Sequence, residues 1–322
     1  MDFDGSSPQA EGPINLFMGA SMFKMVTGIV LIMALDPDIL FNAGYNDLID
    51  VRFPEGSIVQ PRFPAPLSNR AHTLARVFDV LQGALAHQNP KLATGAACGS
   101  SPHLLYSGTR PDGDFFFLYE INYGGIPGRP VGDGMDVHAW WPHVTSIPAE
   151  YAESHFPVRI ERIASRIDSG GPGLHRGGNG VDKTYVFLAE GEISVHDDRH
   201  VSRPWGIGGG RAAACSRKRL VRADGREEEL PAKIDFVRVE PGDRLLYETA
   251  GGGGWGDPLQ RDPEAVRGDV VRGFVSVEHA RRGYGVVLDS ASLAIDDRAT
   301  AGLREELRAN RPADAPLFDR GD

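Results

Sequence analysis

The chain has 322 residues, of which 41% are hydrophobic and 24% are charged, and its formal net charge is -10. This composition is typical of a globular protein, and the length suits about two domains or one large one. Because nucleic-acid binding needs a basic surface, the acidic balance excludes DNA and RNA as expected partners. Cys98 and Cys215 form no spacing motif, and the first residues lack a basic signal region. We therefore expect a cytoplasmic protein with reduced thiols.

The first 35 residues combine a polar loop with an apolar stretch. The loop, MDFDGSSPQAEGPIN, is rich in turn-forming residues. The apolar stretch from Leu16 to Leu35 has the length of either a buried helix or a membrane span. Lys24 lies near its centre and would cost about 3 kcal/mol in lipid, which favours the buried helix and no membrane partner.

Two further patterns are expected before the glycine-rich region. Residues 48–59, LIDVRFPEGSIV, alternate enough to predict a strand, a turn at Pro54–Gly56 and a second strand. Residues 69–88 carry apolar side chains at helical spacing, with Ser68 or Asn69 as the N-cap, and predict a helix.

A β-rich pattern begins near residue 103. HLLYSG at 103–108 and DFFFLYEINYGG at 114–125 predict strands. The uninterrupted apolar run Phe115–Tyr119 predicts a strand buried on both faces. After it, IPAEYAESHF predicts a short helix and VRIERIASRI a strand.

The predicted fold class is α+β, with mixed helices and strands in the N-terminal part, a β-rich C-terminal module and short C-terminal helices. Gly-rich turns separate the strands expected over residues 170–256, and two short helices follow Asp262. The polar tail predicts one weak helix at Ala299–Leu307 and disorder beyond it. We expect an α+β part at 1–160, a β-rich module at 161–258, a helical piece at 259–290 and a disordered tail at 291–322.

Two glycine-rich segments raise the question of a phosphate or anion site. GGGGWGDP, residues 251–258, contains the spacing G-x-G-x-x-G, but Pro258 and Pro263 interrupt the helix that a dinucleotide loop must open. We therefore favour a turn where backbones approach closely over a nucleotide site. GGPGLHRGGNG, residues 170–180, is interpreted either as an anion cradle or as a long hairpin connection.

Three polar motifs carry candidate chemistry. SVHDDRH places His196, Asp198 and His200 at alternate positions, which suits either a divalent metal site or a solvated strand edge. DGMDVHAWWPH suits a pocket wall with acid/base groups or a tryptophan-anchored loop; its polar and indole side chains are Asp133, Asp136, His138, Trp140, Trp141 and His143. CGSSPH gathers Cys98, Ser100, Ser101 and His103 without a third orienting group, so covalent catalysis is not favoured.

Taken in order, the motifs resemble those of the hydantoinase B / 5-oxoprolinase family, which includes N-methylhydantoinase B-type subunits. The segments that carry the resemblance are DFDGSSPQAEGPIN, FPEGSIVQPRFPAP, VFDVLQGALA, DSGGPGLHRGGNG, RPWGIGGG, ETAGGGGWGDP and DPEAVRGDVVRGFVSVEHARRGYGVVLD. The resemblance runs from residue 1 to about residue 289. Acetone and acetophenone carboxylase subunits are more distant relatives.

The resemblance implies a division of labour between subunits. A hydantoinase A-like partner with an actin-like ATP site activates the ring amide by phosphorylation. The B-type subunit then completes hydrolysis of a cyclic amide such as 5-oxoproline or a hydantoin. ATP is therefore expected on the partner subunit, and the substrate of this chain is expected to be a small cyclic amide.

The chain departs from the family pattern in its length. In the family, the segment similar to DFDGSSPQAEGPIN lies near mid-chain, after a long half with His/Asp-rich motifs that resemble divalent-metal ligands. No residue of this chain matches those ligands, so we expect no metal site here and a missing N-terminal half as a further partner. The family's H-x-H-M-T-N segment is replaced by VHAWWPHVTS.

The resemblance and the polar motifs together give a predicted site. Its substrate-binding residues are Asp2, Ser6, Gln9 and Asn15, and its catalytic residues are Asp4, Asp136 and His138. One alternative is an inactive or split remnant that only binds a partner, which would expose apolar surface. Another is a carboxylase subunit of the acetone carboxylase type, which would consume a ketone with ATP and bicarbonate.

Overall fold

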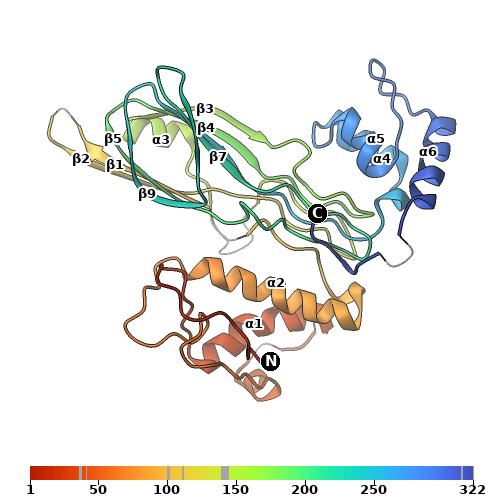
Figure 1. Cartoon of the computed structure of the whole chain (residues 1–322), viewed down its shortest axis with the longest axis horizontal. Helices are drawn as coiled ribbons and strands as arrows, with labels where there is room; N and C mark the ends of the chain where they lie inside the picture. The colour runs from red at the N-terminus through yellow and green to blue at the C-terminus, as the bar shows by residue number, and fades with distance from the viewer. Residues whose placement is uncertain are drawn as a thin grey trace. The chain divides into compact units, whose positions relative to one another are not determined.

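The computed structural model describes residues 1–35, 38–40, 42–99, 102–110, 112–138, 145–312 and 315–321. The chain divides into two compact units, Met1–Ala93 and Thr94–Asp322 (Figure 1). Helices and antiparallel strands both occur, which confirms the α+β class. The predicted domain boundaries near residues 160, 258 and 290 all fall inside the second unit.

The first unit is helical. Its elements are α1 (Ala20–Leu35), η1 (Ala43–Leu48), α2 (Arg70–Gln88) and η2 (Pro90–Leu92). The rings of Phe3, Phe23 and Phe53 pack together, with the Phe3 and Phe23 centroids 5.3 Å apart and the Phe23 and Phe53 centroids 4.7 Å apart. Within the described residues, no helix combines the length and the apolar character that crossing a membrane requires.

The predicted strand pair at 48–59 is wrong. Instead of pairing with itself, this segment hydrogen-bonds to the N-terminal loop: the Phe3 N–H donates to the Arg52 carbonyl at 3.1 Å, and the Ile58 N–H donates to the Ser7 carbonyl at 2.9 Å. Pro54 has no N–H to donate, which weakens a hairpin ladder at this point. The alternation of the sequence therefore marks contacts with a distant loop and not a regular strand.

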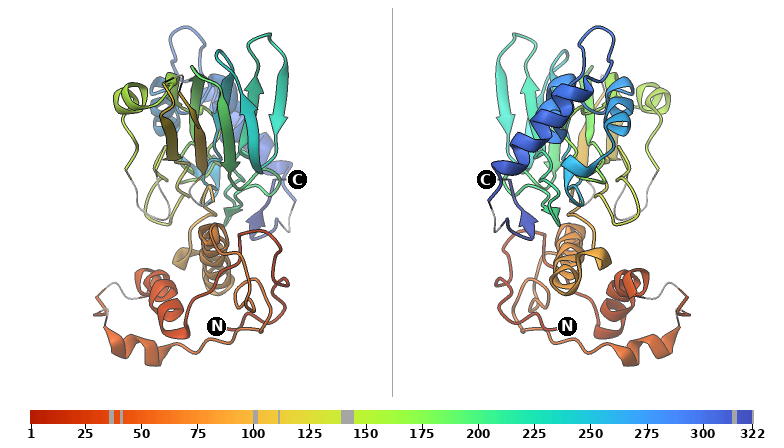
Figure 2. Two further views of the ribbon diagram at one scale, coloured as in Figure 1. Left: turned by 90° about the vertical axis from the view of Figure 1, so that its left-hand side faces the viewer. Right: turned by 90° about the vertical axis from the view of Figure 1, so that its right-hand side faces the viewer.

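The second unit contains two antiparallel sheets packed face to face (Figures 1 and 2). In the described part of the chain, the four-stranded sheet has the order β2-β1-β5-β9 and the five-stranded sheet has the order β3-β4-β10-β7-β8. Their strands are β1 (His103–Thr109), β2 (Phe115–Ile121), β3 (Val158–Ser165), β4 (Val181–Phe187), β5 (Gly191–His196), β7 (Arg217–Val221), β8 (Glu227–Leu230), β9 (Lys233–Val239) and β10 (Arg244–Glu248). Helix α3 (Ala149–His155) precedes β3.

The core of this unit is formed by alternate residues of the facing strands. Tyr106, Tyr185 and Tyr247 are fully buried there together with Leu118 and Phe187. Burial of such large apolar surfaces is the main force that holds two sheets together. Strands β1, β2, β5 and β10 thus contribute alternate residues to the core between the sheets.

Strand β2 corrects the prediction of burial on both faces. Phe116 and Leu118 face the core, whereas Phe115, Phe117 and Tyr119 are 71%, 49% and 45% exposed. In a sandwich of two sheets, the facing sheet covers only the inner face of a strand such as β2. The residues of this apolar run thus alternate between the core and the outer surface of the sheet.

Helices and a short sheet complete the second unit. The helices are η3 (Pro258–Gln260), α4 (Pro263–Val271), α5 (Val277–Tyr284) and α6 (Asp297–Ala309), and the right-hand view of Figure 2 brings the last of these to the front. Asp262, Ser276 and Asp296 each accept a hydrogen bond from the first turn of the helix that follows, as N-caps do.

The predicted disordered tail at 291–322 contains ordered elements. Helix α6 extends beyond the weak helix that the sequence predicts, and β11 (Phe318–Asp319) pairs with β6 (Gly206–Ile207). The Arg304 guanidinium donates to the Tyr284 carbonyl at 3.1 Å and to the Arg261 carbonyl at 2.7 Å. These tertiary hydrogen bonds hold a helix whose own composition is polar.

The glycine-rich segments lie against one another as extended chains. A β-carbon added to Gly125 would lie 1.9 Å from the Gly178 carbonyl oxygen, and one added to Gly177 would lie 1.7 Å from the Gly252 oxygen. The Gly252 N–H donates to the Gly178 carbonyl at 2.9 Å. Glycine is thus required here because backbones touch, which agrees with the close-approach interpretation of GGGGWGDP.

Candidate functional site

Three polar segments of the second unit meet at one end of the sandwich. The Asn122 N–H donates to the Pro102 carbonyl at 2.7 Å, and the Cys98 N–H donates to the Gly125 carbonyl at 3.2 Å. A β-carbon added to Gly99 would lie 3.1 Å from that of Asp198. Residues 98, 99 and 102 therefore lie beside residues 122–125, whose Gly124 pairs with His138, and beside Asp198.

His103 is the most strongly perturbed imidazole in this region. It begins β1 and stands opposite His196 of β5 in the ladder. Burial and the neighbouring His196 lower the pKa of His103 to about 4, so its ring is neutral at pH 7. Its Nε2 lies 3.3 Å from the Tyr119 hydroxyl, close enough for a proton to be exchanged between them.

His196 is held by a carboxylate. Its Nε2 lies 2.7 Å from the Oδ1 atom of Asp235 on β9. Such a contact fixes the orientation of an imidazole ring. The His103–Tyr119 and His196–Asp235 pairs thus lie next to each other on the outer side of the four-stranded sheet. The sequence singles out His196 only as a metal ligand.

A second polar group lies inside the sandwich. Lys183 donates to the Glu120 carboxylate at 2.5 Å, and the Tyr185 hydroxyl donates to the same carboxylate at 2.7 Å. Burial and the nearby Glu120 charge raise the pKa of Tyr185, so the phenol keeps its proton and acts as donor. These side chains are almost completely buried and satisfy one another, which indicates a structural role.

The motif SVHDDRH ends in a further buried cluster. Asp197 forms an ion pair with Lys218, and the Lys218 Nζ atom lies 3.1 Å from the His200 Nε2 atom. Burial and the Lys233 charge lower the pKa of His200. β5 ends at His196, so Asp198 and His200 do not extend the strand face on which a metal was predicted.

The described residues hold no group of three or more His, Cys, Asp or Glu side chains that would bind a metal ion. The metal-site interpretation of His196, Asp198 and His200 is therefore not supported by their geometry. Ser100 and Ser101 of CGSSPH lie outside the described residues, as do Trp140, Trp141 and His143 of the tryptophan motif.

Asp136 belongs to a buried ion network. Both of its oxygens accept hydrogen bonds from Arg176 at 2.8 Å, and its Oδ1 also accepts the Asn179 N–H at 2.7 Å. Arg176 also pairs with Asp269 at 3.3 Å. Because Arg176 binds both oxygens of this carboxylate, the predicted acid/base residue has the geometry of a structural anchor.

The same network includes the loop that precedes Asp136. Arg261 donates to both oxygens of Asp133 at 2.7 Å and to Asp269 at 2.8 Å. Burial opposes ionisation of Asp133, but Arg261 and Arg176 outweigh it and lower the pKa of this carboxyl group. Arg176 belongs to the segment 170–180, for which the sequence predicts an anion cradle or a hairpin connection, and it already has carboxylate partners inside the chain.

The other predicted catalytic residues lie in different units. His138 is half-buried in the second unit, where its backbone pairs with Gly124. Asp4 is exposed in the first unit, and its carboxylate has no hydrogen bond or ion pair among the described residues. The Asp4 carboxylate is thus accessible to a ligand, whereas Arg176 occupies both oxygens of Asp136.

The predicted substrate-binding residues all lie in the N-terminal loop of the first unit. Asn15 is fully buried and bonds only to the backbone, accepting from the Ala10 N–H and donating to the carbonyls of Ala10, Gly12 and Pro66.

Three residues of this set bond within the loop region. Gln9 accepts the Arg62 N–H at 2.7 Å, the Ser6 hydroxyl donates to the Phe3 carbonyl at 2.7 Å, and Asp2 pairs with Arg52 at 3.5 Å. The set therefore organises the loop.

Comparisons with known proteins bear out the resemblance that the motifs suggest. The sequence profile of the family described as hydantoinase B/oxoprolinase matches residues 1–258. The B-type subunit of a putative D-/L-hydantoinase from a Pseudomonas species is 31% identical over 312 residues, which are 95% of this chain and 52% of that protein. The chain spans about half the length of the curated relatives it matches.

Two solved structures share the fold. The crystal structure of an ATP-dependent caprolactamase from Pseudomonas jessenii has a TM-score of 0.80 and 26% identity, over 94% of this chain and 54% of that one. The nucleotide-free structure of an acetone carboxylase has a TM-score of 0.79 over 98% of this chain and 47% of that one, and its 22% identity supports likeness of fold alone. Since the profile covers most of the chain and a 31% identical relative covers nearly all of it, the chain belongs to the hydantoinase B/oxoprolinase family.

Proposed function

We propose that this chain is part of the B-type subunit of an ATP-dependent hydrolase that opens a small cyclic amide. In this proposal ATP binds to a separate hydantoinase A-like subunit. The substrate is a hydantoin, 5-oxoproline or a lactam. The observation that carries the proposal is the family match over residues 1–258.

The names of the relatives support the reaction class. The related proteins include the B-type subunit of a putative hydantoinase, the beta subunit of a caprolactamase and 5-oxoprolinases, and the ring of each named substrate contains an amide. Two of these names denote subunits, which supports an assembly of more than one chain. The caprolactamase with a solved structure is described as ATP-dependent.

We assign roles to the predicted residues according to their surroundings. Asp4 is proposed to contact the reacting group, because its carboxylate is exposed and makes no hydrogen bond or ion pair within the described chain. His138 is proposed as a second proton carrier. Asp136 is proposed to position the backbone next to His138 through Arg176, and Asn15 to hold the loop that presents Asp4.

A divalent metal, which the resemblance implies, finds no donor set in the described residues of this chain. We therefore derive no step of the reaction through a metal. In the proposed enzyme its ligands belong to a part of the family architecture that this chain does not span.

Reconstitution tests the proposal. This chain, together with the part of the family architecture that it does not span, is combined with a hydantoinase A-type subunit. Ring opening of hydantoin, 5-oxoproline and caprolactam is followed by mass spectrometry with and without ATP. We expect ATP-dependent opening of one of these rings. Asp4→Asn and His138→Gln should each lower kcat by about 100-fold, whereas Asp224→Asn, which changes an exposed carboxylate, should not.

Other outcomes would contradict the proposal. Consumption of a ketone together with ATP and bicarbonate, without ring opening, would identify a carboxylase subunit. Assembly with the A-type subunit without turnover of any of these compounds would identify a chain that only binds its partner. Unchanged turnover of both the Asp4 and His138 variants would leave the reaction class intact and reject the residue assignment.

A further inference from the structure

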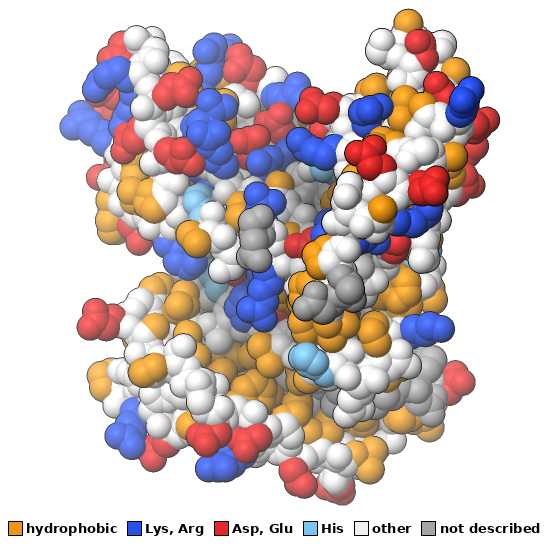
Figure 3. Space-filling model, turned by 45° about the vertical axis from the view of Figure 1, so that its right-hand side comes forward, with side chains coloured by type: hydrophobic (Ala, Val, Ile, Leu, Met, Phe, Trp, Pro, Cys, Tyr) orange, Lys and Arg blue, Asp and Glu red, His pale blue; other side chains and the backbone are white. Residues whose placement is uncertain are grey.

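The outer faces of the two sheets differ in the pairing of their charged side chains. On the five-stranded sheet, charged side chains are paired with one another across or beside the strands. These pairs are Arg217–Glu229, Arg219–Glu227, Arg244–Glu161 and Arg162–Asp182. On the face that Figure 3 presents, basic and acidic side chains are likewise interspersed. Such a surface is typical of one that faces water.

The four-stranded sheet has a different outer face. One rung of its ladder contains Phe117, Ser107, Glu192 and Arg238, in that order across β2, β1, β5 and β9. Arg238 forms its ion pair with Glu190, in the turn before β5, and not with Glu192 opposite it. The Glu192 carboxylate has no hydrogen bond or ion pair among the described residues.

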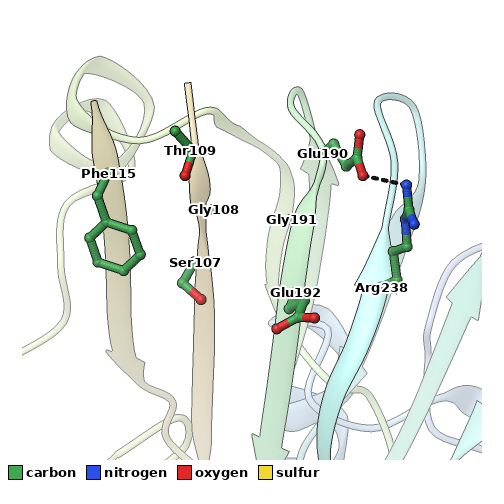
Figure 4. Close-up of a pocket in the computed structure, with 8 residues that line it drawn as sticks. All are labelled: Ser107, Gly108, Thr109, Phe115, Glu190, Gly191, Glu192 and Arg238. Atoms are coloured by element: carbon green, nitrogen blue, oxygen red, sulfur yellow. Dashed lines mark hydrogen bonds and ion pairs between the residues drawn. The ribbon is translucent and has the colours of Figure 1, made fainter. Parts of the chain in front are cut away.

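A hollow of about 420 Å³ lies at this rung (Figure 4). Ser107, Gly108 and Gly191 line its middle. The Phe115 ring stands on one side of β1, and Glu192 and the Glu190–Arg238 pair stand on the other. Two carboxylates and one guanidinium give the hollow a net charge of -1.

This arrangement matches the chemistry of a basic side chain. A guanidinium or ammonium group above Ser107 can contact the aromatic face of Phe115 or Phe117 and pair with Glu192. We propose that the outer face of the four-stranded sheet binds a partner polypeptide that inserts an arginine or lysine from an apolar segment into this hollow. The hydroxyl groups of Ser107 and Thr109 offer acceptors for its remaining N–H groups.

The extent of the apolar surface favours a polypeptide over a small cation. Phe117 and Tyr119 continue the aromatic row along β2, outside the hollow, and are 49% and 45% exposed. Phe236 on β9, at the other edge of the sheet, is 76% exposed. A small amine would cover only the hollow, whereas an extended segment would also cover the aromatic row. Exposed aromatic rows of this kind mark interaction surfaces.

The strand edges support the same conclusion. β8 has three consecutive acids, Glu227–Glu229, and β3 and β9 each have an irregular register in their pairing. These features protect an edge against association. β2 pairs with β1 in an unbroken register, and its single charge, Glu120, points inward to Lys183. The aromatic row therefore lies beside the least protected edge of the sandwich.

Titration with synthetic peptides tests the proposal on the full chain. The probe is an extended peptide with one central arginine between leucines, and its control has glutamine in place of arginine. Binding is followed by NMR shifts of the chain and by calorimetry. We expect the arginine peptide to bind at least about fivefold more tightly than the control, with shifts at Ser107 and Phe117. Glu192→Gln and Phe117→Ser should each weaken it about three- to tenfold.

Matched variants and probes separate the alternatives. Val201→Ser removes a side chain that is 92% exposed elsewhere, and Glu278→Gln removes an exposed acid; neither should change binding. Equal binding of both peptides, or an unchanged affinity of Glu192→Gln, would overturn the proposal. Binding of N-acetylarginine methylamide as tightly as the peptide would show a small-ligand site instead.

A self-association test shows whether a second copy of the chain occupies this surface. If sedimentation shows a dimer of the chain that Phe117→Ser dissociates, a second copy occupies the surface and the proposal fails. The inference concerns a surface and not the proposed reaction, and the peptide assay needs neither ATP nor a cyclic amide. Its failure would therefore be distinguishable from failure of the proposed hydrolase activity.

Discussion

Asp136 illustrates how a tertiary partner changes the meaning of a sequence motif. In DGMDVHAWWPH the carboxylate stands two residues from His138 and has acid/base potential. In the folded chain Arg176 binds both of its oxygens, and the Arg176 side chain is only 7% exposed. Arg176 comes from a loop 40 residues away, so no local pattern reveals the pair.

Replacing Asp136 with Asn should destabilise the second unit. After this change, Asp269 is the only carboxylate that still pairs with the buried Arg176 among the described residues. Removing one partner of a buried ion pair costs about 3–5 kcal/mol of stability. Urea unfolding measures the loss. Asp224→Asn is the matched control, because Asp224 and its partner Arg226 are mostly exposed and should contribute little. Equal losses in both variants would contradict the buried anchor.

His103 makes the free energy of unfolding depend on pH. Its pKa is lowered from 6.5 to about 4, so the folded chain resists protonation that the unfolded chain accepts. Stability from this residue is therefore complete above about pH 6.5 and is lost as the pH falls toward 4. The difference between the two pKa values corresponds to about 3 kcal/mol.

The variant His103→Gln should remove this dependence. Between pH 7 and pH 4 the free energy of unfolding of the wild type should fall by about 3 kcal/mol more than that of the variant. Urea titrations at a series of pH values give this difference. An NMR titration of the His103 ring with a midpoint near 6.5 would show that burial does not act as described.

At the scale of elements, β2 shows that an apolar residue in the sequence need not be a buried residue in the fold. The run FFFLY predicts burial throughout, but the sandwich covers only alternate residues. We expect Phe116→Ala, at a position 3% exposed, to cost about 3–5 kcal/mol. Phe117→Ala, at a position 49% exposed, should cost less than about 1 kcal/mol. The two positions are adjacent in the sequence. Equal losses of unfolding free energy in chemical denaturation would contradict the alternation of buried and exposed residues along β2.

The elements that the sequence predicts well are those with strong local signals. Helix α2 follows the helical spacing of residues 69–88, and α4 and α5 are the two short helices expected after Asp262. In the segment 48–59 the predicted turn at Pro54–Gly56 is present, but the two predicted strands are not, because their hydrogen-bond partners lie in the N-terminal loop. Local periodicity cannot report such distant partners.

At the scale of the whole molecule, the division after Ala93 makes a specific prediction about stability. Asn15→Ala removes four hydrogen bonds of a fully buried side chain and should destabilise the first unit by about 2–4 kcal/mol. Hydrogen exchange should then rise in Met1–Ala93 and stay unchanged in β4 and β10 of the second unit.

The control for this prediction is Asp4→Asn in the same loop. Asp4 is exposed and its side chain makes no bond within the described chain, so hydrogen exchange should not change. Faster exchange throughout both units of the Asn15 variant would show that the chain unfolds as one cooperative body. That result would contradict a separate stability for the first unit.

The sequence by itself determined the family, the α+β class and the strands and helices with strong periodic patterns. These features depend on residue order over short distances, which a chain carries without being folded. Only the tertiary structure decided that Asp136 is an anchor, that Asn15 holds a loop, that Phe117 faces outward and that Glu192 lacks a partner among the described residues. Each depends on residues brought together from distant segments, and burial, pairing and pKa are properties of those contacts.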